Sequence, residues 1–353
     1  MHVDPALFSS MGSFLQYLLP HFRALSLPVF DQQNLEKLGQ HLPLVSLGCF
    51  ELELDHPASK LDMAVNLVRA AGEWDAFLHH SAKLSGGIPS PLQGFMHGCM
   101  LPSSALNQYV PNIWLNLDNH ILPGALPSTW FYVGLPPHPF GVELEKELAL
   151  QVMKLISPAL FAKNQGYLEH IMSLFAKGQR LRGVASLERR GLSQFRLIVS
   201  HFPEPSGLAT FLKKLGWPGD YPYLEAVLGP LLPMVDRCDL ALDVDQQLGK
   251  RIGVELFLPL CTDFGYFEHF TQKIDRFYPL DQGKIKGIKS YFGHKPSPAD
   301  INWQPSQGML PGKLPCRQPG MTNRWVMHLK IVFEPGQIVK VKAYLGFTYT
   351  RAL

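Results

Sequence analysis

The chain has few charged residues for its length. Asp, Glu, Lys and Arg make up 17% of its 353 residues, whereas apolar residues make up 46%. So little charge does not suit a bundle of exposed helices, and it favours many half-buried strands. The formal net charge of +3 is too small to predict a nucleic-acid partner. No segment approaches the roughly 18 apolar residues that a membrane span needs, so we expect no membrane partner.

Cysteines are also few, and no two of them form a CxxC pair. The five cysteines lie far apart, at Cys49, Cys99, Cys238, Cys261 and Cys316. This pattern argues against a disulfide framework and fits a reducing compartment. The N-terminus lacks the basic region and apolar run of a signal peptide. We therefore expect a cytoplasmic protein.

Common catalytic and metal-binding patterns are missing as well. The chain has no G-x-S-x-G, which argues against an α/β-hydrolase. Residues 85–87 do not belong to a G-x-x-x-x-G-K-[ST] phosphate loop. The adjacent His79 and His80 point to different sides of a helix, and together with His97 they lack further ligands at fitting spacing. We therefore predict no metal site.

The most informative pattern is a two-strand unit that recurs five times. In each copy, polar and apolar residues alternate along two successive segments. The segments are residues 50–54 and 61–67, 114–118 and 130–133, 184–188 and 195–200, 239–245 and 251–256, and 328–332 and 339–345. Successive strand side chains point to opposite faces, so each segment has one apolar and one polar face. The sequence therefore predicts five antiparallel hairpins.

Helical patterns precede the first hairpin and separate the others. The clearest is residues 142–177, where Leu148, Val152, Leu155 and Ile156 form an apolar stripe. Further helices are predicted in a lead-in over residues 6–44 and at 206–215, 223–235 and 264–274. Residues 86–111 are rich in Gly, Pro and Ser and predict a loop.

The helices need an apolar sheet face to cover, so the polar faces of the hairpins must point away from them. Ten strands could close into an antiparallel β-barrel that collects the polar residues inside. An open ten-stranded sheet would expose aggregation-prone edges, although two stacked α+β sheets are the alternative. We expect one domain over residues 1–353, in which the long loop 281–322 is either a lid or a disordered connector.

The polar strand faces supply the candidates for the barrel interior. The acids are Glu51, Glu53, Asp62, Asp118, Asp243 and Glu255. The bases are Lys60, Arg196, Arg251, Lys330, Lys340 and Lys342, with His328. The aromatic candidates are Trp114, Trp130, Tyr132 and Tyr344.

Buried charges are costly unless they pair with one another or meet a ligand. The acids and bases could simply neutralise each other. Alternatively, several cations converge on an anion, and Lys and Arg donors suit a diphosphate. Neighbouring tyrosines and tryptophans would suit an unsaturated hydrocarbon, because their π-faces stabilise a carbocation.

This pattern resembles the ABBA-type aromatic prenyltransferases, which include the dimethylallyl-tryptophan synthases and the cyanobactin peptide prenyltransferases. In that family, repeated α-β-β-α units form a ten-stranded antiparallel barrel with the helices outside and the active site inside. Glu51 and Lys60 are similar to the family's acid on the first strand and base on the second. Residues 340–344, Lys-Val-Lys-Ala-Tyr, resemble its paired basic and tyrosyl positions. Residues 251–255 keep the arginine but have Gly and Glu where the family has basic or tyrosyl residues.

The resemblance implies a role for each candidate. Glu51 would accept the proton of the prenylated acceptor, with Glu53 as the second choice. The diphosphate would be bound by Lys60, Arg196, Arg251, Lys340 and Lys342. The cation and the acceptor would be enclosed by Tyr132, Tyr344, Trp114, Trp130 and His328. The chain has no DDxxD-type acidic cluster, so these cations would replace a metal and Mg²⁺ would at most stimulate.

The resemblance therefore implies a transferase that moves an allylic isoprenyl group, dimethylallyl or geranyl, from a diphosphate to an acceptor. The acceptor would be an aromatic small molecule or a peptide side chain. Two alternatives stay open. One is a barrel that binds a peptide or an isoprenoid without turnover, and the other is an acid–base isomerase or cyclase that uses Glu51 and Glu53.

Overall fold

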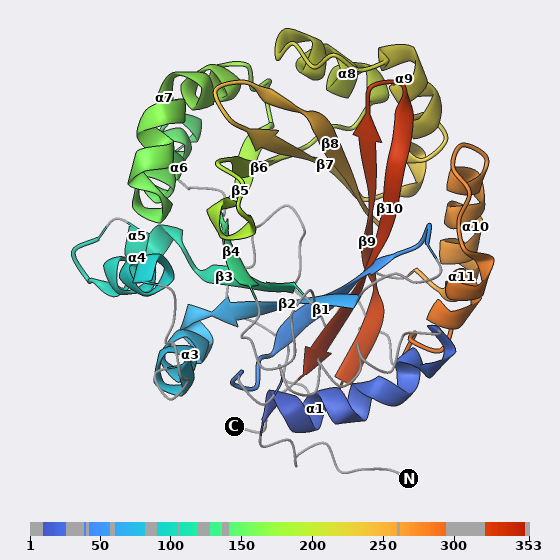
Figure 1. Cartoon of the computed structure of the whole chain (residues 1–353), viewed down its shortest axis with the longest axis horizontal. Helices are drawn as coiled ribbons and strands as arrows, with labels where there is room; N and C mark the ends of the chain where they lie inside the picture. Colours follow the sequence, from blue (N-terminus) through green and yellow to red (C-terminus); the bar gives the residue numbers. More distant parts are fainter. Residues whose placement is uncertain are drawn as a thin grey trace.

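The computed structural model describes residues 10–25, 39, 42–56, 61–81, 90–104, 106–118, 128–135, 141–259, 262–293 and 322–349. Ten strands in this part of the chain form a closed antiparallel barrel with helices around its outside (Figure 1). Consecutive strands are neighbours, and the barrel closes where the first strand pairs with the tenth. The predicted α+β class and ten-stranded barrel are therefore confirmed.

The strands fall on the ten predicted segments and extend most of them by a few residues. They are β1 (Leu47–Glu53), β2 (Leu61–Val68), β3 (Asn112–Asp118), β4 (Ser128–Gly134), β5 (Arg180–Ser186), β6 (Phe195–Ser200), β7 (Arg237–Val244), β8 (Leu248–Phe257), β9 (Thr322–Glu334) and β10 (Gln337–Tyr349). Each predicted pair is a local hairpin, for example β9 with β10.

Helices occupy the connections between the hairpins. They are α1 (Met11–Leu18), α3 (Glu73–Ser81), α4 (Ser90–Met100), α5 (Leu106–Tyr109), α6 (Val142–Ile156), α7 (Pro158–Ser173), α8 (Pro205–Lys214), α9 (Tyr221–Leu228), α10 (Phe264–Asp275) and α11 (Gln282–Ile288). Short 3₁₀ turns accompany them, namely η2 (Leu19–Leu25), η3 (Arg69–Ala71), η4 (Glu188–Arg190) and η5 (Leu232–Met234). None of the helices described here is long and apolar enough to cross a membrane.

The hydrophobic core lies between the outer face of the barrel and the helices. Fully buried strand residues such as Leu240 and Val254 belong to the same apolar cluster as Val152 of α6 and Phe267 of α10. Burial of these side chains is the main term that stabilises such a fold. Because the apolar faces point outward to the helices, the polar faces are left to line the interior.

Two stretches differ from the predicted loops. Residues 90–100 form α4, because Leu92, Phe95, Met96 and Cys99 recur at helical spacing and are buried. Gln282–Ile288 form α11, which begins behind the N-cap Asp281. The prediction of a loop from residue 281 is therefore wrong at its start. Residues 294–321 of that predicted loop lie outside the described part of the chain.

The buried carboxylate of Glu73 ties the first hairpin to α3. It accepts hydrogen bonds from the backbone N–H and the hydroxyl of Ser46, both at 2.8 Å, and from the N–H of Val68 at 2.8 Å. Ser46 lies next to the start of β1 and Val68 ends β2. One carboxylate therefore fixes two strand ends at the first residue of a helix.

Replacing Glu73 with Ala should lower the free energy of unfolding by about 3 kcal/mol or more, because buried donors would lose a charged acceptor. Urea denaturation is the measurement. Glu147→Ala, on the exposed face of α6, is the control and should change stability by less than about 0.5 kcal/mol. Equal effects of the two variants would contradict the anchoring role.

Candidate active site

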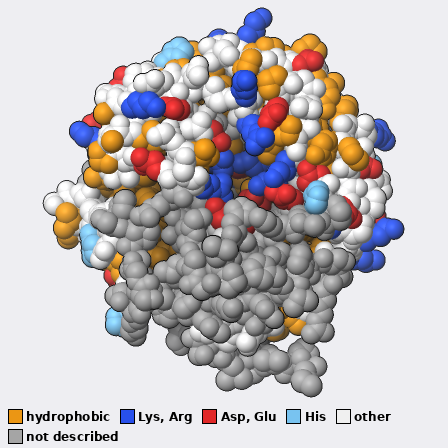
Figure 2. All heavy atoms as spheres, in the orientation of Figure 1, with side chains coloured by type: hydrophobic (Ala, Val, Ile, Leu, Met, Phe, Trp, Pro, Cys, Tyr) orange, Lys and Arg blue, Asp and Glu red, His pale blue; other side chains and the backbone are white. Residues whose placement is uncertain are grey.

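The polar strand faces surround a cavity of about 190 Å³ inside the barrel. Its lining includes four cationic side chains and three carboxylates. They are Arg182, Arg196, Arg237, Lys330, Glu51, Asp239 and Glu255. In the orientation of Figure 1, basic and acidic side chains gather in a hollow at the centre of one face (Figure 2).

Most of the predicted interior residues that can be placed lie inside the barrel. Those that line the cavity are Glu51, Trp114, Tyr132, Arg196, Glu255, His328, Lys330 and Tyr344. Lys342 contacts Glu51 directly. The alternation of polar and apolar residues therefore identified the inward face of these strands.

Glu51 is held by two partners from β10. Lys342 donates from Nζ to Oε1, and the Tyr344 hydroxyl donates to Oε2 at 2.6 Å. Burial alone would raise the pKa of Glu51, but the charge and hydrogen bond of Lys342, with the bond from Tyr344, lower it well below its usual range. Glu51 is therefore a charged carboxylate inside the barrel.

A second carboxylate, Glu53, lies nearer the end of β1. Lys340 Nζ is 2.5 Å from its Oε1, and Lys342 Nζ is 4.0 Å from the same oxygen. The Lys340 side chain is 38% exposed, twice the 19% of Lys342. Lys340 and Glu53 therefore lie near the rim of the barrel, and Glu51 is the deeper carboxylate.

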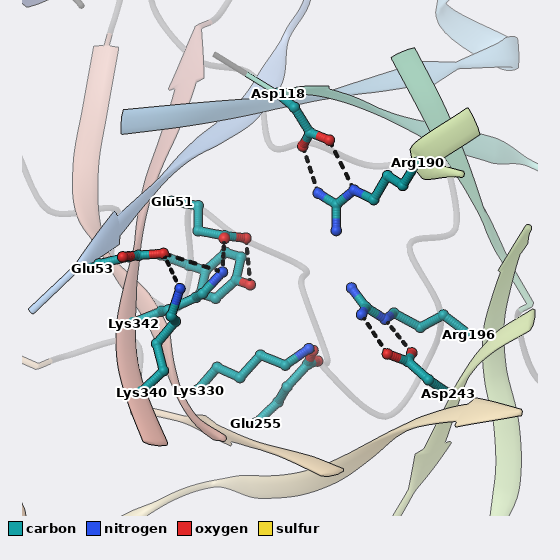
Figure 3. A network of polar contacts seen from close by, with 11 residues as sticks. Glu51, Glu53, Asp118, Arg190, Arg196, Asp243, Glu255, Lys330, Lys340 and Lys342 are labelled. Carbon is teal, nitrogen blue, oxygen red and sulfur yellow. Dashed lines mark hydrogen bonds and ion pairs between the residues drawn. The ribbon is translucent and has the colours of Figure 1, made fainter. Parts of the chain in front are cut away.

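Two arginines approach from the other side of the barrel. Arg196 makes a two-pronged pair with Asp243, at 2.7 and 2.8 Å, and Arg190 makes one with Asp118, at 2.8 and 2.5 Å. Figure 3 shows both guanidinium groups pointing inward, toward the side on which Glu51 lies. Fixed guanidinium groups of this kind suit an oxyanion ligand.

Lys330 of β9 supplies a further interior cation. Its Nζ lies 3.0 Å from Glu255 Oε1 of β8, and its side chain is 10% exposed. Burial lowers the pKa of Lys330, and the carboxylate of Glu255 opposes that effect. Glu255, which stands where the family has a basic or tyrosyl residue, is thus the partner of an interior lysine.

Aromatic rings form the adjacent part of the wall. The His328 ring is stacked between Phe257, with centroids 4.5 Å apart, and Tyr344, at 4.0 Å. Burial lowers the pKa of His328 to about 4, so the imidazole is neutral near pH 7. No described residue makes a hydrogen bond to its Nδ1. The stack therefore offers an uncharged aromatic surface that includes the polar Nδ1 of His328.

Sequence reasoning missed a second charged group at this wall. Arg237 and Arg182 of β7 and β5 both approach Asp239, with nitrogen–oxygen distances of 2.9 and 3.8 Å. Arg237 also lies 3.6 Å from the centre of the Phe257 ring. Burial lowers the pKa of Arg237 to about 10, against the opposing charge of Asp239. Asp239 and Arg182 belonged to predicted or adjacent strand segments, but no motif marked them.

Some of the predicted site residues do not lie at the cavity or cannot be placed. Arg251 faces the rim near the start of β8, where its 69% exposed side chain pairs with Glu334 at 2.5 Å, and it does not line the cavity. Lys60 and the side chain of Trp130 lie outside the described residues. Within the described ranges, no cluster of three or more His, Cys, Asp or Glu side chains could hold a metal ion.

Comparison with known proteins finds similarity at the level of structure. No protein-family model matches the sequence, and no curated protein matches it. The 5-dimethylallyltryptophan synthase from Streptomyces coelicolor superimposes with a TM-score of 0.58 at 12% identity, over 96% of this chain and 97% of that one. The prenyltransferase PriB, in its apo form, gives 0.56 at 12%, over 98% of both chains.

A third similar structure contains ligands. It is the 6-dimethylallyltryptophan synthase from Micromonospora olivasterospora in complex with DMASPP and Trp, with a TM-score of 0.56, 13% identity and coverage of 94% of this chain and 95% of that one. At such low identity these likenesses establish the fold. The chain has the barrel architecture of aromatic prenyltransferases.

The lowered pKa of Glu51 predicts how stability changes with pH. A carboxylate with a lowered folded-state pKa stabilises the protein above its unfolded pKa, about 4.3 for Glu, and that contribution is lost as the pH falls. Glu51→Gln should therefore lose less stability than the wild type between about pH 6 and pH 3. Urea denaturation across this range is the measurement. Glu169→Gln, at an exposed position, is the control. If it reduced the loss of stability over this pH range as much as Glu51→Gln, the assignment to Glu51 would be contradicted.

Proposed function

We propose that this chain is a prenyltransferase of the ABBA barrel type. It would move an allylic isoprenyl group from a diphosphate donor to an aromatic molecule or a peptide side chain. One observation carries the proposal: inside a closed barrel, interior cations lie next to an aromatic wall, and a partly buried carboxylate, Glu51, contacts both. A diphosphate with an unsaturated tail needs both surfaces at once.

The strand register supports this reading. Tyr344, His328 and Phe257 are successive register neighbours across β10, β9 and β8. One pleat further along the same strands, Lys342, Lys330 and Glu255 are neighbours in the same way. Charged and aromatic side chains thus occupy adjacent tiers of the wall. A diphosphate on the charged tier would place its hydrocarbon tail on the aromatic tier.

In the proposed reaction, the bond between C1 of the donor and the diphosphate oxygen breaks, and both electrons leave with the diphosphate. Arg196 and Lys342 stabilise the charge that develops on the leaving group, with Lys340 nearer the rim and Lys60 as a further candidate. The rings of Tyr344, Tyr132 and Trp114 enclose the allyl cation and keep water away from it.

An electron-rich atom of the acceptor then attacks the allyl cation, and a new bond to C1 forms. The proton that this atom loses passes to Glu51, which returns it to solvent. The protonated adduct is strongly acidic, so a carboxylate with a lowered pKa can still accept its proton. Glu51 fits this role better than Glu53, because Glu53 lies at the rim beside Lys340.

The interior cations offer several charged hydrogen-bond donors to a diphosphate. We therefore propose that the reaction requires no metal ion and that Mg²⁺ at most stimulates it. The similar 6-dimethylallyltryptophan synthase was crystallised with DMASPP and Trp, which supports a donor and an acceptor of this kind without fixing either for this chain.

Diphosphate binding can be measured by thermal shift. Dimethylallyl or geranyl diphosphate should raise the melting temperature of the wild type, because a ligand that binds the folded state stabilises it. The double variant Arg196→Met/Asp243→Asn removes both charges of one pair and should abolish the shift. Arg251→Ala, at the exposed rim, is the matched control and should keep most of it. No shift with any allylic diphosphate would exclude both the transferase and an isoprenoid-binding barrel.

Transfer can be separated from binding at Glu51. Glu51→Gln should retain the thermal shift and lose at least about 100-fold in product formation, because it keeps the shape of the side chain without the base. Mass spectrometry of products from five-, ten- and fifteen-carbon diphosphates, with tryptophan and with Tyr- or Trp-containing peptides, is the measurement. Parallel reactions in EDTA and in Mg²⁺ test the metal independence.

The outcome also discriminates among the alternatives. Undiminished transfer by Glu51→Gln would remove Glu51 from its role. A wild-type protein that binds the diphosphate but forms no product with any acceptor would favour a non-catalytic barrel. Conversion of a substrate without transfer of the isoprenyl group would favour an isomerase or cyclase.

A further inference from the structure

Arg324 of β9 is a buried arginine that faces the outside of the barrel. The next residue, Trp325, belongs to the apolar cluster inside the barrel, whereas Val326 belongs to the core between the strands and the helices. Arg324 shares the face of Val326, because side chains alternate along a strand, and it lies opposite Phe347 of that outer core. Its side chain is therefore separate from the cavity.

The end of α11 and the N-terminal helices lie around this side chain. The guanidinium carbon is 5.9 Å from the centre of the Tyr291 ring, and a Cβ atom built on Gly293 would be 2.6 Å from Nε and 2.7 Å from Nη2. The hydroxyl of Ser290 donates a hydrogen bond to the carbonyl of His21 at 2.8 Å, which joins the end of α11 to η2. Figure 1 shows α1 and α11 next to each other on the outside of the barrel. The guanidinium thus lies where β9, η2 and the end of α11 meet.

No carboxylate in the described part of the chain compensates the charge of Arg324. The residue is 9% exposed, and its Nη1 is buried without a hydrogen-bond partner. Burial lowers its pKa, and the groups that oppose this effect are Tyr291 and Tyr17. By contrast, Arg196 inside the barrel has Asp243. A buried charge is costly unless a partner compensates it.

We propose that Arg324 binds a small oxyanion such as inorganic phosphate at the junction of β9, η2 and α11. A guanidinium offers parallel N–H donors to two oxygens of an oxyanion. Tyr17 and His21, which are half-buried and interact electrostatically with Arg324, are the candidates for further contacts. The bound anion compensates the buried charge and ties the N-terminal helices to β9. This site does not depend on the proposed function.

Inorganic phosphate is the probe, and isothermal titration calorimetry measures its affinity. The background is Arg196→Met/Asp243→Asn, in which the interior of the barrel has lost one charge pair. Adding Arg324→Met should weaken phosphate binding at least about tenfold, and Arg324→Lys should weaken it less, because lysine keeps the charge. Arg276→Met, at the exposed end of α10, is the matched control and should not change the affinity. Absence of phosphate binding, or unchanged binding after Arg324→Met, would overturn the proposal.

Thermal stability gives a second measurement. In phosphate-free buffer, Arg324→Met should melt at a higher temperature than the wild type, because it removes an uncompensated buried charge. Phosphate and sulfate should then raise the melting temperature of the wild type more than that of Arg324→Met. The difference between the two proteins is the quantity to compare, because both anions also stabilise proteins by exclusion from their surface. Equal responses would indicate that water alone satisfies the guanidinium, and the proposal would be wrong.

The close approach at Gly293 allows a double-mutant cycle. Gly293→Ala should displace the guanidinium and weaken phosphate binding when Arg324 is present, and it should have less than a twofold effect in the Arg324→Met background. Equal effects in both backgrounds would contradict a role through Arg324. Circular dichroism of each variant confirms that it is folded.

The outcomes for this site and for the proposed function are distinguishable. Phosphate binding that depends on Arg324, in a protein that responds to no allylic diphosphate, would support the outer site and contradict the proposed function. A protein that transfers an isoprenyl group but shows no phosphate binding that depends on Arg324 would contradict the outer site alone.

Discussion

Pairing of charges inside the barrel is the constraint on which the other features of the site depend. Moving a carboxylate or an ammonium group out of water costs several kcal/mol of free energy unless a partner replaces its hydration. Inward-pointing charged side chains therefore pair with an opposite charge, often on a neighbouring strand, as Glu51 has Lys342 and Arg196 has Asp243. The same pairs hold the donors in fixed directions before any ligand arrives, which lowers the entropy cost of binding an anion.

The barrel and much of its interior could be predicted because strand alternation is a local property. Lys342 and Tyr344 sit two residues apart between buried Val341, Ala343 and Leu345, so their shared inward face could be read from the sequence. Depth along the strand could not be read in the same way. Arg251 has the same parity as Glu255, yet it stands at the exposed rim, because alternation gives the face of a residue and not its distance from the barrel end.

Other residues depend on tertiary contacts that no local pattern contains. Arg190 is in a short turn outside the strands, and its partner Asp118 is 72 residues away in the sequence. The path of Lys330 depends on a glycine of another strand. Residues 90–100 were predicted as a loop from their Gly and Pro content, although their apolar residues have helical spacing and pack as α4. In this segment the helical spacing was a local signal that the Gly and Pro content outweighed in the prediction.

The pairing of β1 with β10 has a consequence for how the protein is made. Glu51 and Tyr344 are 293 positions apart, so a ribosome that adds 5–20 residues per second needs roughly 15–60 s between them. Throughout that interval the edge of β1 has no final partner, and an unpaired strand edge is a template for association with other chains. The seam between β1 and β10 can therefore close only after the last hairpin has been synthesised, and until then the edge of β1 can pair with other chains.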